Sequence, residues 1–251
     1  TATFSSPYAC SSTSGSIIYN VSGAGTVFVS DFSSATLPAG TTSAGNDFSA
    51  SDLGRMRLTS AANSKNGGVL IPNNTGLASN QFQIDFDMIT TPSTAAPAAD
   101  GFSYSYGPDV VALPSGVPTN AENGSGTKLK LAFDAYTNAG NTAGIYLMYN
   151  CNVNNQTPAT AGVLYYNPTT TWVATATAGA STHVTIKINA IGKISMWLNG
   201  VQVVTDVSLP ASYLTDNKAT WKHAFSARTG GLNQGHYIDN LDIHYNIYEY
   251  S

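Results

Sequence analysis

The chain has 251 residues, of which 42% are hydrophobic, so it is long enough to bury a sizeable core as one domain. Only 10% of the residues are charged, and the net charge is −4. The ten lysines and arginines are scattered along the chain, which excludes the basic patch typical of proteins that bind nucleic acid or an anionic membrane. We therefore expect a single domain, residues 1–251, with the weakly charged polar surface of a secreted protein.

No run of about 18 apolar residues occurs, so we expect no membrane-spanning helix and no membrane insertion. The chain starts at Thr1 without the basic start and apolar stretch of a signal peptide. We interpret Thr1 as the residue that follows a removed leader or as the first residue of a piece cut from a longer protein. Cys10 and Cys151 lack the close spacing of a zinc site and form a candidate disulfide in an oxidising compartment, with two buried thiols as the alternative. These features favour an extracellular or cell-surface location.

Nearly every apolar segment alternates with a period of two residues, which predicts strands and no convincing helix. The first such segments are Thr26–Val29 and Arg55–Leu58. Residues 81–89 place Phe, Ile, Phe and Met at every second position, which predicts an antiparallel strand with one buried face and one wet face. The same pattern predicts strands at residues 102–106, 128–134, 145–149, 224–227 and 238–248.

Residues 183–204 predict a three-strand meander. Two alternating segments are separated by a turn at 189–193, and the second leads into Asn199-Gly200. Asn-Gly is the strongest short hairpin signal because both residues tolerate the positive φ of a type I′ turn. We expect residues 33–51 to be an irregular excursion, and long connections at 90–98, 107–126 and 152–162 to carry binding residues on a rigid sheet. The whole pattern predicts two packed antiparallel sheets.

Three short motifs follow one another along the chain: Ala99-Asp100-Gly101-Phe102, then Phe133-Asp134-Ala135-Tyr136-Thr137-Asn138, then Phe225-Ser226-Ala227-Arg228-Thr229-Gly230-Gly231 with His236-Tyr237-Ile238 behind it. In this order they resemble the L-type (legume-like) lectins of the concanavalin A-like superfamily, and most closely the lectin-like modules of bacterial surface and secreted proteins. The resemblance covers about residues 81–245. It implies an all-β fold, a two-sheet antiparallel jelly-roll β-sandwich, and a carbohydrate-binding function.

The resemblance also implies roles for individual residues. Asp100 would accept hydrogen bonds from sugar hydroxyls, which suits an ionised carboxylate, and a cis peptide bond would precede it. The loop between the Thr-Gly pair and His236 would help to determine sugar specificity. Without the resemblance, Asp-Gly and Gly-Gly are equally typical of ordinary turns. The carbohydrate-binding residues implied in this way are Asp100, Asn138, Gly231, Leu232 and Asn233.

Asp134, Tyr136 and Asn138 resemble the calcium segment of the family, in which a carboxylate, a backbone carbonyl and an amide oxygen bind one Ca²⁺. Ala132 stands where the family has a glutamate for a second, transition metal, so we expect that second site to be absent. With one nearby carboxylate, calcium would bind weakly, with a Kd of about 10⁻⁴ to 10⁻³ M, and Asn141 or a residue from 90–99 would complete the site. The alternative is a metal-free loop in which Asn138 caps a turn with its own side chain.

The same superfamily contains glycoside hydrolases, which need two carboxylates on either side of the scissile bond. The only glutamates, Glu122 and Glu249, form no Glu-x-Asp-x-x-Glu motif, and Asp85 and Asp87 are interpreted as a solvated strand face. His236 is interpreted as a structural residue. We therefore expect a non-catalytic module that binds glycans or polysaccharide and serves adhesion, with avidity from a homo-oligomer or from repeats in a larger adhesin. The alternatives are an adhesive or structural protein-binding module with a vestigial sugar site and, after it, a hydrolase.

Overall fold

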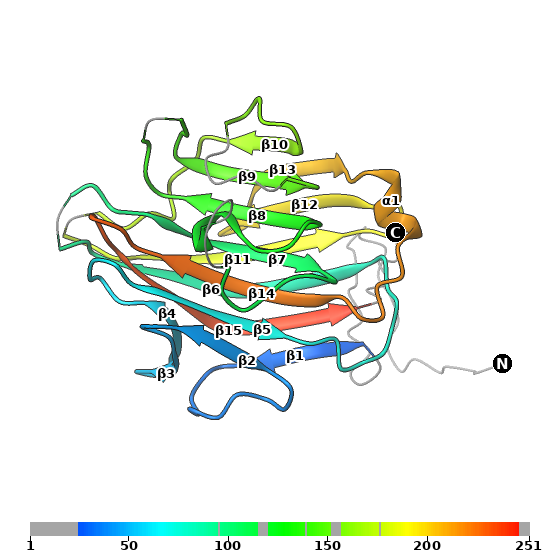
Figure 1. Cartoon of the computed structure of the whole chain (residues 1–251), viewed down its shortest axis with the longest axis horizontal. Helices are drawn as coiled ribbons and strands as arrows, with labels where there is room; N and C mark the ends of the chain where they lie inside the picture. The colour runs from blue at the N-terminus through cyan, green and yellow to red at the C-terminus, as the bar shows by residue number, and fades with distance from the viewer. Residues whose placement is uncertain are drawn as a thin grey trace, which may run out of the picture.

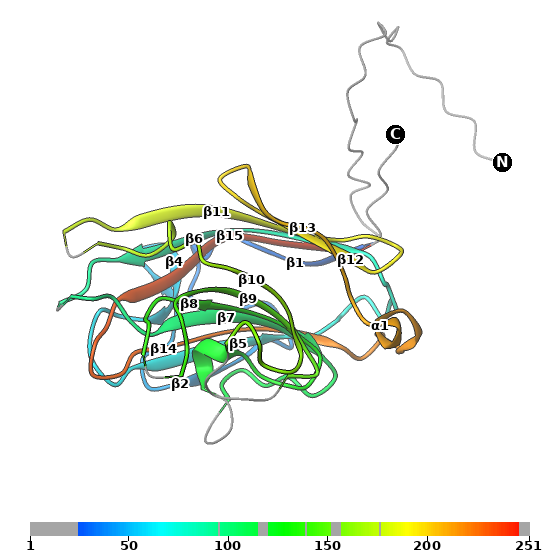
Figure 2. The same cartoon turned by 90° about the horizontal axis from the view of Figure 1, so that it is seen from above.

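The computed structural model describes residues 25–94, 96–114, 120–138, 140–151, 157–175 and 177–245. Within these residues the strands form two antiparallel sheets, which lie face to face as two layers (Figure 2). The eight-stranded sheet has, in spatial order, β13 (Val201–Ser208), β12 (Lys193–Leu198), β11 (Ala180–Ile188), β6 (Phe82–Thr91), β15 (Gly235–Tyr245), β4 (Arg55–Thr59) and β3 (Ser49–Asp52), with β1 (Thr26–Ser30) also paired to β15 (Figure 1).

The second sheet is seven-stranded, and the prediction of an all-β two-sheet sandwich is confirmed. Its strands are, in spatial order, β10 (Val163–Asn167), β9 (Gly144–Tyr149), β8 (Leu129–Asp134), β7 (Gly101–Gly107), β14 (Lys222–Arg228), β5 (Asn66–Ile71) and β2 (Thr42–Gly45).

The core lies between the two sheets because each strand turns its apolar positions inward. Along β6, buried and half-buried residues alternate without a break, as the period of two predicts. Phe86 of the eight-stranded sheet meets Phe225 of the seven-stranded sheet edge to face, with ring centroids 5.3 Å apart. Aromatic pairs of this kind join the two layers into one hydrophobic cluster.

The predicted meander is present as β11, β12 and β13. Its second turn has Asn199 at φ 48° and Gly200 at φ 78°, so both residues adopt the positive φ that the Asn-Gly signal predicts. The Asn199 N–H donates to the His183 carbonyl at 2.8 Å, and the Asn199 Oδ1 accepts the His183 N–H at 2.8 Å. These bonds tie the turn to the neighbouring strand β11.

The expectation of no helix is wrong at one place in the described residues, because α1 spans Ala211–Thr215. Five residues are too few to show a helical period in the sequence. The helix is anchored by Tyr213, which is buried and donates its hydroxyl to the Asn80 carbonyl at 2.9 Å. No helix among the described residues has the length and apolar character needed to cross a membrane.

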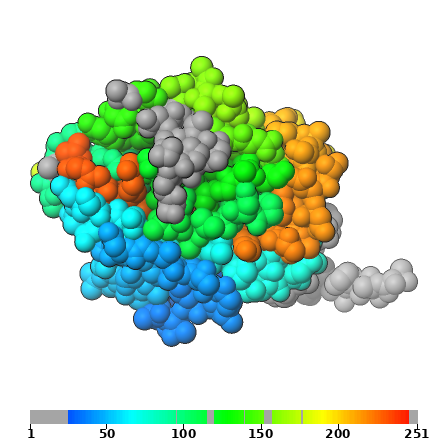
Figure 3. Space-filling model, viewed as in Figure 1, coloured from blue at the N-terminus to red at the C-terminus, as the bar shows by residue number. Residues whose placement is uncertain are grey.

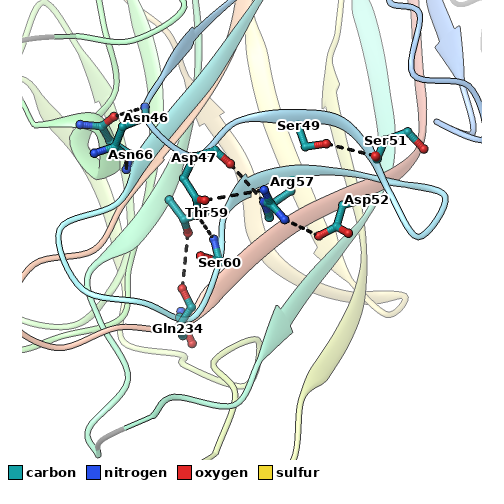
Figure 4. A network of polar contacts seen from close by, with 10 residues as sticks. All are labelled: Asn46, Asp47, Ser49, Ser51, Asp52, Arg57, Thr59, Ser60, Asn66 and Gln234. Atoms are coloured by element: carbon teal, nitrogen blue, oxygen red, sulfur yellow. Dashed lines mark hydrogen bonds and ion pairs between the residues drawn. The ribbon is translucent and has the colours of Figure 1, made fainter.

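The expectation of an irregular excursion at 33–51 is also partly wrong, because β2 and most of β3 lie there. All four residues of β2 are exposed, so this edge strand has no buried face that could produce an alternating pattern. Figure 4 shows how the region is held: the Arg57 guanidinium donates to the Asp52 carboxylate at 2.7 Å and to the Asp47 carbonyl at 3.1 Å.

The outer face of the seven-stranded sheet is covered by the connection between β7 and β8. We call residues 108–114 and 120–127 of this connection the cover segment; it includes the short 3₁₀ helix η1 (Ala121–Asn123). The backbone of the cover segment comes so close to the sheet that a Cβ added to Gly68 of β5 would lie 1.8 Å from the Ala112 carbonyl oxygen. Only glycine fits at that contact.

Hydrogen bonds fasten the cover segment to the sheet. The Ala121 carbonyl accepts the hydroxyls of Ser103 at 2.6 Å and Ser226 at 2.8 Å. Lys130, predicted to lie on a wet face, is only 1% exposed. That expectation is wrong because the polar pattern of a strand does not reveal which distant segment will pack on it.

Candidate functional site

Three strands of the seven-stranded sheet reach the same end of the sheet, and the three sequence motifs meet there. Gly101 at the start of β7 pairs with Asp134 at the end of β8 and with Arg228 at the end of β14. Asp100 lies between those two strand ends: its N–H donates to the Arg228 carbonyl at 3.2 Å, and its carbonyl accepts the Ala135 N–H at 2.8 Å. We call this end, with the described parts of loops 91–100, 135–143 and 229–234, the site rim (left in Figure 1).

Asp100 places a partly exposed carboxylate at the site rim, with the Arg228 guanidinium 3.3 Å from one of its oxygens. The Ala99–Asp100 peptide bond is cis, as the resemblance implies. The Asp100 side chain is 16% exposed, its Oδ2 atom is buried, and this oxygen accepts no hydrogen bond from the described residues. Burial raises the pKa of Asp100 to about 6, although the nearby Arg228 guanidinium acts in the opposite direction. Asp100 is thus a partly buried carboxylate with unused hydrogen-bonding capacity.

The loop after β14 leaves room beside this carboxylate. A Cβ added to Gly230 would lie 3.0 Å from Asp100 Oδ2, whereas a Cβ added to Gly231 would meet no atom within 4 Å. The loop turns tightly, since the Gly230 N–H donates to the Leu232 carbonyl at 3.1 Å and the Gly230 carbonyl accepts the Ser64 N–H at 3.0 Å. Figure 3 shows the orange-red residues of this connection at the surface, between cyan and green segments.

Asn233 differs from its predicted role as a sugar ligand. Its side chain is buried, with the residue 1% exposed. The Oδ1 atom accepts the Thr94 N–H at 3.0 Å, and the Nδ2 atom donates to Thr94 Oγ1 at 2.7 Å and to Asn63 Oδ1 at 2.5 Å. Because both polar ends already have protein partners, we correct the prediction: Asn233 joins the loops of the site rim and does not face a ligand.

His236 is a buried residue that holds the base of the same loop. Its Nδ1 lies 2.7 Å from Thr59 Oγ1, and its Nε2 lies 3.0 Å from the side-chain nitrogen of Gln234. Thr59 also donates to the Gln234 carbonyl at 3.4 Å (Figure 4). Burial lowers the pKa of His236 to about 3, so the ring is neutral, which agrees with the structural role predicted for it. Sequence reasoning missed Thr59 and Gln234.

The predicted calcium segment is organised by Asn141. Asp134 is 2% exposed; its Oδ1 accepts the Tyr136 N–H at 3.0 Å and its Oδ2 accepts the Asn141 side-chain amide at 2.5 Å. Burial raises the pKa of Asp134 to about 7. Asn138 is exposed, and its N–H donates to Asn141 Oδ1 at 3.1 Å, so the turn is capped by Asn141 and not by the side chain of Asn138.

Calcium takes about 6 to 8 oxygen ligands, usually with several carboxylates. Asp134, Tyr136 and Asn138 offer one carboxylate, one carbonyl and one amide oxygen. Among the residues that the structure describes, no group of three or more His, Cys, Asp or Glu side chains is arranged to hold a metal. The described residues therefore do not fit a tight calcium site.

Sequence reasoning also missed an ion pair behind Asp100. The Arg228 guanidinium donates to both carboxylate oxygens of Glu122, at 2.8 and 2.7 Å. Nothing in the sequence links the two residues, which are 106 positions apart. Of the two cysteines of the predicted disulfide, Cys151 is buried and Cys10 lies outside the described residues.

No family model matches the chain, and no curated protein matches it. Solved structures do. The metal-free exoplasmic/lumenal domain of VIP36 is 15% identical, with a TM-score of 0.64 and coverage of 88% of this chain and 92% of that chain. Lectin II from Ulex europaeus is 17% identical, with a TM-score of 0.62 and coverage of 83% and 93%. The carbohydrate recognition domain of Emp47p is 10% identical, with a TM-score of 0.61 and coverage of 87% and 94%.

The chain has the legume-lectin fold. The resemblance inferred from the three motifs is confirmed at this level. Within the legume-lectin fold, the site rim of this chain brings Asp100, the Asp134 segment and the glycine loop to one end of the seven-stranded sheet. VIP36 has also been solved with Ca²⁺ and Man3GlcNAc bound, and the Ulex lectin with galactose.

Proposed function

We propose that this chain is a non-catalytic, lectin-like module that binds glycans at the site rim, with Asp100 as the principal sugar ligand. The observation that carries the proposal is the partly exposed Asp100 carboxylate, which Arg228 Nη2 approaches at 3.3 Å without a hydrogen bond and beside which Gly230 has no side chain. An ionised carboxylate makes stronger hydrogen bonds to sugar hydroxyls than a neutral acceptor does.

Other atoms of the site rim complete the proposed contact. Gly231 is exposed, so its backbone and that of Leu232 are available to a ligand that reaches Asp100. Asn138 is exposed on the neighbouring loop and offers an amide donor and acceptor. The likeness to lectin structures supports the ligand class, since VIP36 is described with a mannose-containing glycan and the Ulex lectin with galactose. We therefore expect hexose-containing glycans.

The setting we propose is a secreted or cell-surface protein that adheres to glycans. Its support is the composition: charged residues make up 10% of the chain, and hydrophilic uncharged residues fill much of the surface. A shallow single-sugar contact is weak, so copies in a homo-oligomer or repeats in a larger adhesin would supply avidity. The proposal includes calcium assistance through Asp134, Tyr136 and Asn138.

A glycoside hydrolase is the second candidate, because Asp100 and Asp134 both have a raised pKa, as a general acid requires. Two contacts weigh against it. Asp134 is 2% exposed and both of its carboxylate oxygens accept protein hydrogen bonds, so no oxygen faces a substrate. Both carboxylate oxygens of Glu122 accept hydrogen bonds from the Arg228 guanidinium, so Glu122 is also engaged within the protein. Incubation with labelled polysaccharides and analysis of the products tests this candidate directly, and shortened products would establish it.

A glycan array with the intact chain, followed by calorimetry on the strongest hit, tests the binding proposal. Asp100→Ala should weaken binding by at least about tenfold, which corresponds to the loss of one hydrogen bond to a charged group. Asp87→Ala is the matched control: this carboxylate accepts a 2.8 Å hydrogen bond from His183 on the eight-stranded sheet, and its removal should leave affinity unchanged. An empty array would favour the protein-binding module, and full affinity in Asp100→Ala would exclude Asp100 as the ligand.

A further inference from the structure

Arg228 and Glu122 form a bidentate ion pair at the back of the site rim. Nε of Arg228 donates to Oε2 of Glu122 at 2.8 Å, and Nη2 donates to Oε1 at 2.7 Å. The Glu122 side chain is 7% exposed, so the pair is shielded from water on the carboxylate side. Bidentate pairs of this kind fix the plane and the position of the guanidinium. Since Glu122 belongs to η1, the position of Arg228 depends on the cover segment.

The same guanidinium borders Asp100. Nη2 of Arg228 lies 3.3 Å from Asp100 Oδ2, a contact that counts as an ion pair but not as a hydrogen bond, because Oδ2 has no hydrogen-bond partner among the described residues. The backbone contributes as well, because the Arg228 carbonyl accepts the Asp100 N–H at 3.2 Å. Arg228 therefore holds Asp100 from two sides, through an ion pair to the carboxylate and a hydrogen bond to the backbone.

The contact with Glu122 limits how closely the Arg228 guanidinium approaches the Asp100 carboxylate. Nε and Nη2 of the guanidinium donate to Glu122, so the side of Arg228 that carries these two donors is not available to Asp100. An arginine free of Glu122 would be expected to close over Asp100 with two parallel hydrogen bonds, which is the preferred geometry of this pair. Within the part of the chain that the structure describes, the charged groups that act on Asp100 are Arg228 from β14, Glu122 from η1 and Asp134 from β8. Arg228 is the single cation among these four groups.

We propose that Arg228 and Glu122 are positioning residues: Arg228 keeps Asp100 charged, and Glu122 holds Arg228 in place, so that the exposed part of the Asp100 carboxylate stays open to a saccharide hydroxyl. This inference rests on the proposed glycan-binding function. In this proposal an internal ion pair holds Asp100 in place. The described residues of the calcium segment do not form a complete set of metal ligands that could do so. Each partner has a separate effect, because Arg228 supplies the positive charge and Glu122 restrains the arginine.

The two partners can be separated by the pH dependence of glycan affinity, measured by calorimetry on the full chain. Arg228→Gln removes the cation beside Asp100, so the carboxylate ionises less readily and the pH midpoint of binding should move upward. Glu122→Gln removes a nearby negative charge and frees Arg228 to pair with Asp100, so the midpoint should move downward while affinity at neutral pH falls by about tenfold. A purely structural role would not move the two midpoints in opposite directions.

Lys128→Gln is the matched control, because it breaks the 2.7 Å Lys128–Asp216 ion pair near α1, at the other end of the sandwich. It should change neither affinity nor midpoint. Wild-type affinity in folded Glu122→Gln, or midpoints that move together, would overturn the proposal. If the wild type binds no glycan, the proposed function fails on its own, and NMR titration of the Asp100 carboxyl group in the same variants still tests the pair. If Arg228→Gln does not fold, Glu122→Gln decides the outcome.

Discussion

Asn233 and Thr94 are joined by two hydrogen bonds, one from the Thr94 N–H to Asn233 Oδ1 at 3.0 Å and one from Asn233 Nδ2 to Thr94 Oγ1 at 2.7 Å. The two residues belong to different connections, one between β6 and β7 and the other between β14 and β15. Their contact holds the loop that carries Asp100 against the loop that carries Gly230. The shape of the site rim therefore depends on a side chain that does not face the ligand.

Asn233→Ala should lower the free energy of unfolding by about 2–4 kcal/mol, because it removes three hydrogen bonds from a buried side chain and leaves their partners unsatisfied. Urea denaturation measures the change. The control is Asn74→Ala, since this exposed residue donates a single bond to the Ala39 carbonyl at 3.2 Å and should shift stability by about 0.5 kcal/mol or less. Equal effects of the two substitutions would contradict the role given to Asn233.

Gly230→Ala should weaken glycan binding with little loss of stability. The added methyl group would lie 3.0 Å from Asp100 Oδ2, and the flexible carboxylate end can move away from it at small cost, which displaces the acceptor. Calorimetry and thermal unfolding together separate the two effects. Gly231→Ala, whose methyl group meets no atom within 4 Å, serves as the control for folding alone. Unchanged affinity in Gly230→Ala would show that the position of Asp100 does not matter.

Calcium should have a small effect on stability. A site with a Kd of about 10⁻⁴ to 10⁻³ M contributes about 0.4–1.4 kcal/mol at ~1 mM calcium and raises Tm by about 1–5 °C. Thermal unfolding with calcium, with magnesium and with a chelator measures this. Asp134→Asn should abolish the calcium shift. If calcium changes nothing in the wild type, the calcium prediction is wrong.

His223 should make stability depend on pH. It is buried in the core between the Tyr104 hydroxyl at 2.8 Å and the Tyr245 hydroxyl at 2.9 Å, and burial lowers its pKa to about 3 from 6.5. Because the folded state resists protonation and the unfolded state does not, the stability that neutral His223 provides is complete above pH 6.5. It is lost as the pH falls from 6.5 towards 3.

His223→Gln isolates this effect from that of other titrating groups. The variant should be less stable than the wild type at pH 7.5, and the gap should narrow by about 1.4 kcal/mol per pH unit below pH ~6.5. Urea denaturation at several pH values, with the fold checked by circular dichroism, measures the gap. A gap that stays constant with pH would mean that His223 takes up a proton as readily in the folded state as in the unfolded state.

The strands that the sequence predicted are those with a buried face. Residues 82–91 alternate because every second side chain enters the core, and the pattern is therefore visible without a structure. Strand β2 has no buried residue and β5 begins with Asn66-Gly67-Gly68, so neither carries the pattern. Helix α1 was missed for a similar reason, because one turn has no period.

The candidate site was predictable where a local motif carries it. Asp100, Asp134 and the glycine loop stand in motifs that each span a few residues, and the sheet brings their ends together. The Arg228–Glu122 pair was not predictable, because it joins positions 106 residues apart and forms only when the cover segment packs on the sheet. Asn233 was misassigned because a polar residue in a loop looks the same in the sequence whether it faces solvent or joins two loops.

The cover segment affects which kind of glycan the site rim can bind. With the Ser103 and Ser226 hydroxyls bonded to the Ala121 carbonyl, the described residues of the cover segment occupy part of the broad face of the seven-stranded sheet. A saccharide bound at the site rim, as we propose, would reach Asp100 from the end of the sheet. Such a module would recognise the terminal units of branches and would pass over the interior of a long, unbranched polysaccharide.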